Sequence, residues 1–237
     1  MSRTLILLRH GESIWSAQNR FTGWVDVPLS RRGFQQSRRA GQLLREAGVL
    51  PDVVFTSLLR RATETADVAL DEAGRLWIPV ERSWRLNERH YGALQGKNKE
   101  DIRREFGEER FFTWRRSYSV RPPVIESGSP FDPSHDARYA GEHVPRSEAL
   151  VDVYDREIPY WHTSIEPRLR AGRRVLIVGH GNSLRALLKY IDRISDRDIR
   201  SVNVPTGVPL VFTLDDATLR PQSVTFLGDE VPDSGLE

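Results

Sequence analysis

Two histidines follow apolar runs of the sequence in closely similar contexts. His10 lies in LILLRHGES at residues 5–13, and His180 lies in VLIVGHGNS at residues 175–183. An apolar run followed by glycine is typical of a strand that is buried on both faces and ends at a turn. Because ligands bind at the carboxyl ends of the strands in open α/β sheets, we expect the two histidines to lie side by side at one edge of a sheet.

An imidazole acts as a nucleophile when one ring nitrogen is free and the other donates a hydrogen bond. The turn at Gly11 can bring a backbone carbonyl to the second nitrogen of His10, which makes His10 the candidate nucleophile. Phosphoryl transfer needs cations and donors around the phosphoryl oxygens, and Arg9, Arg61 and His180 could supply them. At an effective dielectric of about 20, a cation about 4 Å from a phosphoryl charge contributes roughly 4 kcal/mol before desolvation.

Other chemistries are less well supported by the sequence. Cysteine is absent, which excludes disulfides, thiolate catalysis and cysteine metal sites. The glycines around His180 resemble a dinucleotide-binding fingerprint, but Leu184 stands at the third glycine position, and the segment also lacks the central serine of a nucleophile elbow. His10, His90 and His180 are not spaced as a metal-ligand set, so we expect no metal.

The elements that must position these residues alternate along the chain. Helix start and stop signals indicate helices over 31–47, 57–72 and 182–191, and a long helix over 147–170 that should break or kink at Pro159 and Pro167. Alternating strands and helices predict an α/β fold of three layers, with a mostly parallel six-stranded sheet covered by helices on both faces. The expected strands are Thr4 to Leu8, Val53 to Thr56, Leu76 to Val80, Arg174 to Val178, Pro209 to Leu214 and Gln222 to Leu227.

The stretch from Tyr118 to Arg146 is rich in proline and has no periodicity, so we interpret it as a long functional loop. The chain length favours one catalytic domain over 1–229, followed by a short tail over 230–237. The formal net charge is +2, which gives no general affinity for nucleic acid. No apolar run is long enough for a signal peptide or a membrane span, so we expect a cytoplasmic protein without a membrane partner.

Seven collinear motifs resemble those of the cofactor-dependent phosphoglycerate mutases of the histidine phosphatase superfamily. Together they extend over residues 3–229. The motifs are LLRHGES, NRFTGWVDVPLS, TSLLRRATET, LNERHYGALQG, WRRSY, HGNSLRALLKY and PTGVPLVF.

The resemblance implies roles for individual residues. It implies that His10 is phosphorylated, that Glu88 is the general acid and base for the substrate hydroxyl, and that Arg9, Arg61 and His180 hold the transferring phosphoryl group. It also implies 2,3-bisphosphoglycerate as the priming phosphoryl donor, phosphoglycerates as substrates, and a homodimer or homotetramer. The residues expected to bind substrate are Ser13, Ser16, Thr22, Gly23, Arg89, Tyr91, Lys99, Arg115, Arg116, Gly181 and Asn182.

Some residues depart from the family pattern or have a simpler interpretation. Ser16 stands where these mutases usually carry asparagine, so its contact with a phosphate would be shorter or bridged by water. Ala149 and Gly179 also depart from the usual residues. Without the motifs, Glu88 with Arg89 would be read as a surface ion pair, and the six tryptophans are best read as packing residues.

There are four alternatives to the mutase. A phosphatase of the same superfamily would share the nucleophile and need not retain a doubly charged intermediate. A bisphosphoglycerate synthase is a closer variant, against which Ser13 argues, because those relatives tend to carry glycine there. From a different class, a catalytically inactive scaffold or an arginine-rich nucleic-acid binder is disfavoured by the intact His10 and Glu88 and by the nearly balanced charge.

Overall fold

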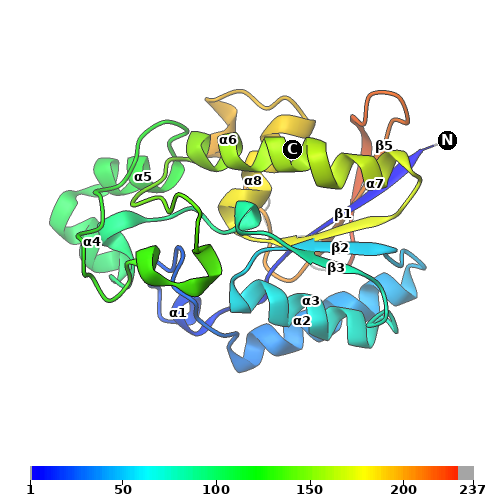
Figure 1. Ribbon diagram of the computed structural model, residues 1–237, viewed down its shortest axis with the longest axis horizontal. Helices are drawn as coiled ribbons and strands as arrows, with labels where there is room; N and C mark the ends of the chain where they lie inside the picture. Colours follow the sequence, from blue (N-terminus) through cyan, green and yellow to red (C-terminus); the bar gives the residue numbers. More distant parts are fainter. Residues whose placement is uncertain (1, 229–237) are drawn as a thin grey trace.

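The computed structural model describes residues 2–228, and in this part of the chain one six-stranded sheet has the strand order β3-β2-β4-β1-β5-β6 (Figure 1). Neighbouring strands from β3 through β1 are parallel, whereas β5 is antiparallel to both β1 and β6. The mostly parallel sheet predicted from the sequence is therefore confirmed. The strands are β1 (Arg3–Arg9), β2 (Val53–Thr56), β3 (Val80–Arg82), β4 (Val175–Gly179), β5 (Pro209–Leu214) and β6 (Pro221–Phe226).

Helices cover both faces of the sheet, which completes the three layers (Figure 1). On one face lie α2 (Arg31–Glu46) and α3 (Arg60–Glu72), and on the other lie α6 (Leu150–Tyr160), α7 (Glu166–Arg170) and α8 (Gly181–Ile191).

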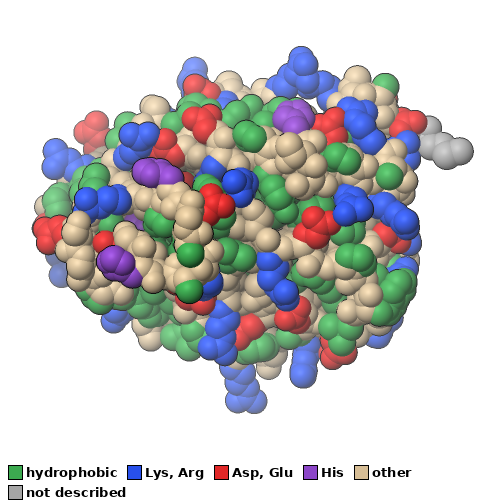
Figure 2. All heavy atoms as spheres, viewed as in Figure 1, with side chains coloured by type: hydrophobic (Ala, Val, Ile, Leu, Met, Phe, Trp, Pro, Cys, Tyr) green, Lys and Arg blue, Asp and Glu red, His purple; other side chains and the backbone are tan. Residues whose placement is uncertain are grey.

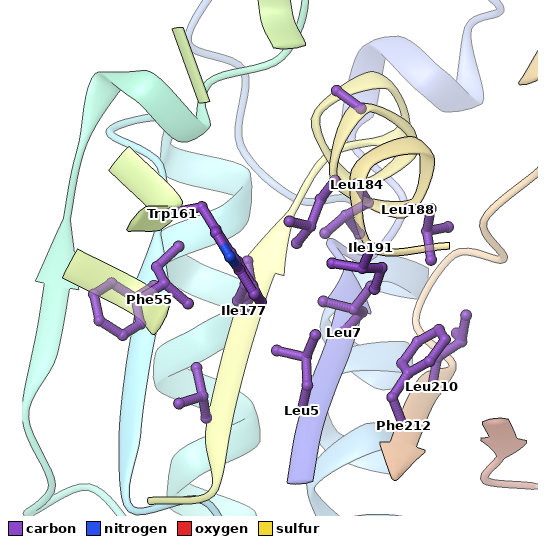
Figure 3. Packing of buried hydrophobic residues seen from close by; sticks show 14 of the residues in the cluster. Leu5, Leu7, Phe55, Trp161, Ile177, Leu184, Leu188, Ile191, Leu210 and Phe212 are labelled. Atoms are coloured by element: carbon purple, nitrogen blue, oxygen red, sulfur yellow. The ribbon is translucent and has the colours of Figure 1, made fainter. Parts of the chain in front are cut away.

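The apolar run of β1 is buried from both sides because successive side chains point to opposite faces of a strand. Leu5 and Leu7 join the core under α6 and α8, whereas Ile6 and Leu8 join the core under α2 and α3. Figure 3 shows Trp161, Leu184 and Leu188 above Leu5, Leu7 and Ile177. The continuous apolar run of β1 is thus explained by burial on both faces of the strand, as the sequence predicted.

A third group of elements lies beyond one end of the sheet (Figure 1). It contains α1 (Ile14–Ala17), α4 (Lys99–Phe106) and α5 (Glu108–Arg116). Residues of α4 and α5 join Phe21 in a separate small core that includes Phe111 and Trp114. Short 3₁₀ turns complete the described elements, at Trp84–Leu86, Gly92–Leu94, Pro133–His135, Ala137–Tyr139 and Asp198–Arg200. Apart from two of these turns, residues 118–146 form the expected loop.

The strand expected over Leu76 to Val80 is wrong, because β3 begins only at Val80. Residues 75–78 form a turn in which Ile78 N–H donates to the Arg75 carbonyl, at 3.2 Å. Trp77 is 74% exposed and lies against the Arg75 guanidinium, so it is not a packing residue. A short strand at the edge of a sheet needs little apolar sequence, which is why the pattern misplaced it.

Two helix boundaries also differ from the prediction. The helix expected from Ser57 begins at Arg60, because Ser57 and Leu59 remain in extended or capping conformations. The helix expected over 147–170 begins at Leu150 and is interrupted by a π-helical segment, Trp161–Ile165, between α6 and α7. Pro159 and Pro167 lack the N–H that a continuous helix needs, and the interruption lies between them. The domain boundary at 229 and the tail over 230–237 fall outside the described residues.

No helix within residues 2–228 is long and apolar enough to cross a membrane. On the face shown in Figure 2, basic side chains are interspersed with acidic ones.

Candidate active site

His10 and His180 are brought together by the pairing of β1 with β4. Arg9 is in register with Gly179, so the residues that follow them leave the sheet at the same edge. The His10 N–H donates to the Gly179 carbonyl at 3.0 Å, and the two imidazole centroids are 4.9 Å apart. The expectation that two strand ends would place these histidines side by side is confirmed.

The ring of His10 is oriented as a nucleophile requires. Its Nδ1 lies 2.7 Å from the carbonyl oxygen of Gly11, which only a protonated Nδ1 can satisfy, so the lone pair is on Nε2. Burial and the neighbouring cations of Arg61 and Arg9 hold the pKa of His10 well below its usual value. His10 is therefore neutral at pH 7, with Nε2 available to attack an electrophile.

The turn after His10 is fixed by a close approach of two glycines. A Cβ atom at Gly11 would lie 2.3 Å from the Gly33 carbonyl oxygen, and one at Gly33 would lie 2.1 Å from the Glu12 carbonyl oxygen. Ser30 caps α2 beside them, because its Oγ accepts the Gly33 N–H and donates to the Glu12 carboxylate. The nucleophile is thus held against the N-terminus of α2, which begins after Ser30 as the sequence predicted.

Arg61 links the nucleophile to the loop after α1. Its Nε lies 3.2 Å from His10 Nε2, and its two terminal nitrogens donate to the carbonyls of Val25 and Gly23 at 3.0 and 2.8 Å. Burial lowers the pKa of Arg61 to about 10, so the side chain still carries its charge at pH 7. Arg9 is anchored in the same way, through a bond from Nη1 to the Val204 carbonyl at 2.9 Å.

Glu88 lines the same cavity as His10 and contacts the segment that follows β4. Its Oε1 accepts hydrogen bonds from the backbone N–H groups of Arg89 at 2.7 Å and Asn182 at 3.2 Å. The Asn182 N–H belongs to the first turn of α8, where the helix dipole favours a negative group. The carboxylate is 9% exposed. It is therefore a buried carboxylate held by donors and still open to the cavity.

Arg156 of α6 supports the segment that carries Glu88. Its guanidinium donates to the carbonyls of Arg85, Asn87 and Glu88 and forms a buried ion pair with Glu148, 2.8 Å from Nε to Oε1. Glu148 in turn accepts the N–H of His90 at 2.8 Å. Because these four backbone groups meet the side chains of Arg156 and Glu148, the position of Glu88 depends on α6 and on the residue pair that links it to this segment.

The cavity in front of His10 is strongly basic. Seven of its lining residues are arginine or lysine, and the single acid among them is Glu88. Burial lowers the pKa of Lys99, and burial with repulsion from Arg116 and Arg89 lowers that of Arg185 to about 9. The cavity thus suits a ligand with several negative charges. Within residues 2–228, no cluster of three or more His, Asp or Glu side chains could hold a metal ion.

Most of the predicted site residues line this cavity, and three do not. Ser13 is buried as the cap of α1, with its Oγ 2.7 Å from that of Ser16. Arg89 donates to the Trp114 and Arg115 carbonyls and stacks on Tyr91, and His180 is fully buried beside His10. The residues that do line the cavity are Arg9, His10, Ser16, Thr22, Gly23, Arg61, Glu88, Tyr91, Lys99, Arg115, Arg116, Gly181 and Asn182.

Four lining residues were not among the predicted ones, namely Arg20, Phe21, Arg185 and Asn203. Arg185 donates to the Asn182 amide oxygen at 2.9 Å. The spacing of three residues from Asn182 places it on the same face of α8, so the helical period could have identified it. Asn203 lies on an irregular segment, where no periodicity gives such a signal.

Comparisons with known proteins agree with this site. The sequence profile of the histidine phosphatase superfamily (branch 1) matches residues 5–225. A 2,3-bisphosphoglycerate-dependent phosphoglycerate mutase of Nocardia farcinica (strain IFM 10152) is 59% identical over 221 residues, covering 93% of this chain and 90% of that protein. The protein of the same name from Thermobifida fusca (strain YX) is 56% identical over 238 residues, covering 99% of this chain and 96% of its own.

Solved structures resemble the fold at lower identity. A mycobacterial glucosyl-3-phosphoglycerate phosphatase in complex with VO3 has a TM-score of 0.70 and 24% identity, with 94% of this chain and 96% of that chain covered. At this identity the likeness concerns the fold alone. The profile match and the curated relatives go further, and they show that the chain belongs to the histidine phosphatase superfamily, among the 2,3-bisphosphoglycerate-dependent phosphoglycerate mutases.

Proposed function

We propose that the protein interconverts 2-phosphoglycerate and 3-phosphoglycerate through a phosphohistidine at His10. The observation that carries the proposal is a neutral imidazole whose Nε2 is unprotonated and lies against Arg61, in a cavity where seven cations and a single carboxylate line the wall. Phosphoglycerates and their bisphosphorylated forms carry several negative charges, and they must stay bound during turnover. A cavity of this charge holds them through both steps.

The role of each group follows from its position. 2,3-Bisphosphoglycerate supplies the phosphoryl group that loads His10. Phosphorylated His10 then loses this group to the free hydroxyl of a phosphoglycerate, with Arg9 and Arg61 beside the moving charge, while Glu88 takes the hydroxyl proton. After the bound glycerate reorients, Nε2 of His10 accepts the other phosphoryl group, and Glu88 returns the proton to the oxygen that is left.

The remaining cations are assigned to the carboxylate and the second phosphate of the substrate. Lys99, Arg115 and Arg116 come from α4 and α5, outside the sheet, and they face His10 across the cavity. Ser13 and Arg89 act indirectly, through residues that line the cavity. The Ser13 hydroxyl bonds to that of Ser16, and the Arg89 guanidinium stacks on the Tyr91 ring. Ser16, Thr22, Gly23, Gly181 and Asn182 supply polar groups at the cavity wall.

Water must be kept from a phosphohistidine, because hydrolysis would release the phosphoryl group. We assign this function to the loop over 118–146. Its Tyr139 accepts a hydrogen bond from Asn87 and packs on Trp24, and its Phe131 packs on Trp15. We also propose cytoplasmic location and a homodimer or homotetramer, as in the family that the motifs indicate.

The decisive experiment compares the protein with its His10→Ala variant. After incubation with 2,3-bisphosphoglycerate, mass spectrometry should find one phosphoryl group on His10 of the parent and none on the variant. A coupled assay should detect 2-phosphoglycerate formed from 3-phosphoglycerate only with the parent. Retention of either activity by the variant would contradict the scheme.

A phosphatase of the same superfamily is the second candidate, because the solved structures that share the fold include phosphatases. The same coupled assay separates the two. Inorganic phosphate released without isomerised product would favour the phosphatase, and net accumulation of 2,3-bisphosphoglycerate would favour a synthase.

A further inference from the structure

A buried hydrogen bond joins the ends of two neighbouring strands behind the nucleophile. Ser57 follows β2 and His180 follows β4, and these strands are parallel and in register at Thr56 and Val178. The Ser57 Oγ lies 2.7 Å from Nε2 of His180. Both side chains are completely buried, so water does not compete for this contact.

The direction of this hydrogen bond follows from the other contact of the hydroxyl. Ser57 Oγ accepts the N–H of Leu59 at 3.1 Å. Among the described contacts of this hydroxyl, Nε2 of His180 is the one available acceptor for its hydrogen. The reverse direction would leave a buried O–H without a partner, which costs about 1–3 kcal/mol. Ser57 is therefore the donor, and Nε2 of His180 carries the lone pair.

The other ring nitrogen of His180 must then carry the proton. Within residues 2–228, Nδ1 of His180 is a buried atom with no hydrogen-bond partner in the protein. Burial and the nearby groups Arg61, His10 and Arg156 hold the pKa of His180 well below its usual value. His180 is thus a neutral ring with one N–H donor, for which the described part of the chain offers no acceptor.

We propose that Ser57 is a positioning residue that fixes His180 as the neutral Nδ1–H tautomer, so that His180 presents one N–H donor to the phosphoryl group carried by His10. The two rings are 4.9 Å apart, and Arg61 already contacts His10. A protonated His180 would add a further buried cation beside Arg61 and Arg9. A neutral donor contributes a hydrogen bond to the phosphoryl oxygens without that repulsion.

The tautomer itself is independent of the reaction, whereas the role of the donor depends on the proposed phosphohistidine function. The two parts therefore need separate measurements. Nitrogen-15 NMR of the ring nitrogens distinguishes a protonated Nδ1 from a bare one in the protein without ligand. The His180 signals are assigned by their disappearance in His180→Gln.

Three variants test the positioning role. Ser57→Ala removes the hydroxyl, Ser57→Thr retains it, and Thr163→Ala removes an exposed hydroxyl that bonds to the Pro159 carbonyl, outside the site. Thermal unfolding of each variant gives the fraction that is folded. Activity is then expressed per folded molecule as kcat and KM, together with the rate at which His10 is phosphorylated.

We expect protonated Nδ1 and bare Nε2 in the parent and in Ser57→Thr, and a mixture of tautomers in Ser57→Ala. We expect kcat and the phosphorylation rate of Ser57→Ala to fall about tenfold with little change in KM, which is less than the 10²–10³-fold typical for loss of a whole transition-state donor. Thr163→Ala should keep its kcat.

A protonated Nε2 in the parent would overturn the assignment, whatever the activity. The expected tautomer together with an unchanged kcat in Ser57→Ala would overturn the positioning role. If the parent has the expected tautomer but acquires no phosphoryl group on His10, the proposed function fails and the tautomer stands.

Discussion

Replacement of Arg61 tests the electrostatics of the nucleophile most directly. Arg61→Met removes the cation whose Nε is 3.2 Å from His10 Nε2. At about 4 Å and an effective dielectric of about 20, one cation stabilises a phosphoryl charge by roughly 4 kcal/mol. Since about 1.4 kcal/mol corresponds to a factor of ten in rate, phosphorylation of His10 should slow about 10³-fold.

The same replacement should change the pH dependence of this step. Arg61 helps to hold the pKa of His10 below its usual value, so removing the cation raises that pKa. A protonated imidazole has no free lone pair to attack with. Phosphorylation should therefore stay constant between pH 8 and 6.5 in the parent, whereas in Arg61→Met it should begin to fall at a higher pH than in the parent.

The assay is rapid mixing with 2,3-bisphosphoglycerate, followed by quantification of phosphohistidine by mass spectrometry across this pH range. Arg60→Met is the matched control, because Arg60 is the preceding residue, is exposed and pairs with Glu64 on the surface. Arg61→Met also loses the two hydrogen bonds from Arg61 to the Val25 and Gly23 carbonyls, so thermal unfolding must be measured in parallel. If folded Arg61→Met is phosphorylated less than tenfold more slowly than the parent, the electrostatic argument is refuted. It is also refuted if the rate of Arg61→Met begins to fall at a lower pH than that of the parent.

Three further replacements probe the supports of the site. Burial raises the pKa of Glu157 well above 4.5, and its carboxyl oxygens have no hydrogen-bond partner among the described residues, so the free energy of unfolding falls as pH rises above about 4.5. Glu157→Gln should be more stable than the parent at pH 7 and equal to it near pH 3 in urea unfolding, and a variant less stable at pH 7 would contradict this. Arg156→Met leaves the Glu148 carboxylate buried without its cation, so the free energy of unfolding should fall by about 3–5 kcal/mol, and kcat should fall as Glu88 shifts. An unchanged urea midpoint would argue against the stabilising role of the Arg156–Glu148 ion pair. Gly33→Ala drives a methyl group against the Glu12 carbonyl, so calorimetry should show a loss of about 1–3 kcal/mol with slower phosphorylation of His10, and a parent-like melting temperature would be inconsistent with the close contact.

The central part of the fold could be predicted because its physical signal is local. The apolar runs that became β1 and β4 are buried on both faces, and the glycines after His10 and His180 mark where the strands end. Leu76 and Trp77 are also apolar, and yet they form an exposed turn. The strand was misplaced there because apolar content alone does not distinguish a turn at the edge of a sheet from a strand. For the π-helical segment the sequence predicted only a break or kink at Pro159 and Pro167.

The site was predictable to the extent that its residues lie within recognisable motifs. The motifs supplied His10, Arg61 and Glu88, which the fold places around one cavity. Contacts between distant segments gave no such signal. The Ser57 hydroxyl meets a residue 123 positions away, and the Arg156 guanidinium meets carbonyls about 70 positions away. Such partners are set by the packing of β2, β4 and α6, which only the three-dimensional structure shows.

The position of β1 in the middle of the sheet has a consequence for synthesis of the protein. This strand is synthesised before both of its partners, Val175–Gly179 on one side and Pro209–Leu214 on the other, so one edge stays open until residue 179 has been made and the other until residue 214. An apolar strand with two open edges is a site for wrong pairing in a nascent chain. Chaperone demand should therefore fall on β1, and a product truncated before residue 175 should form neither the sheet centre nor the paired imidazoles.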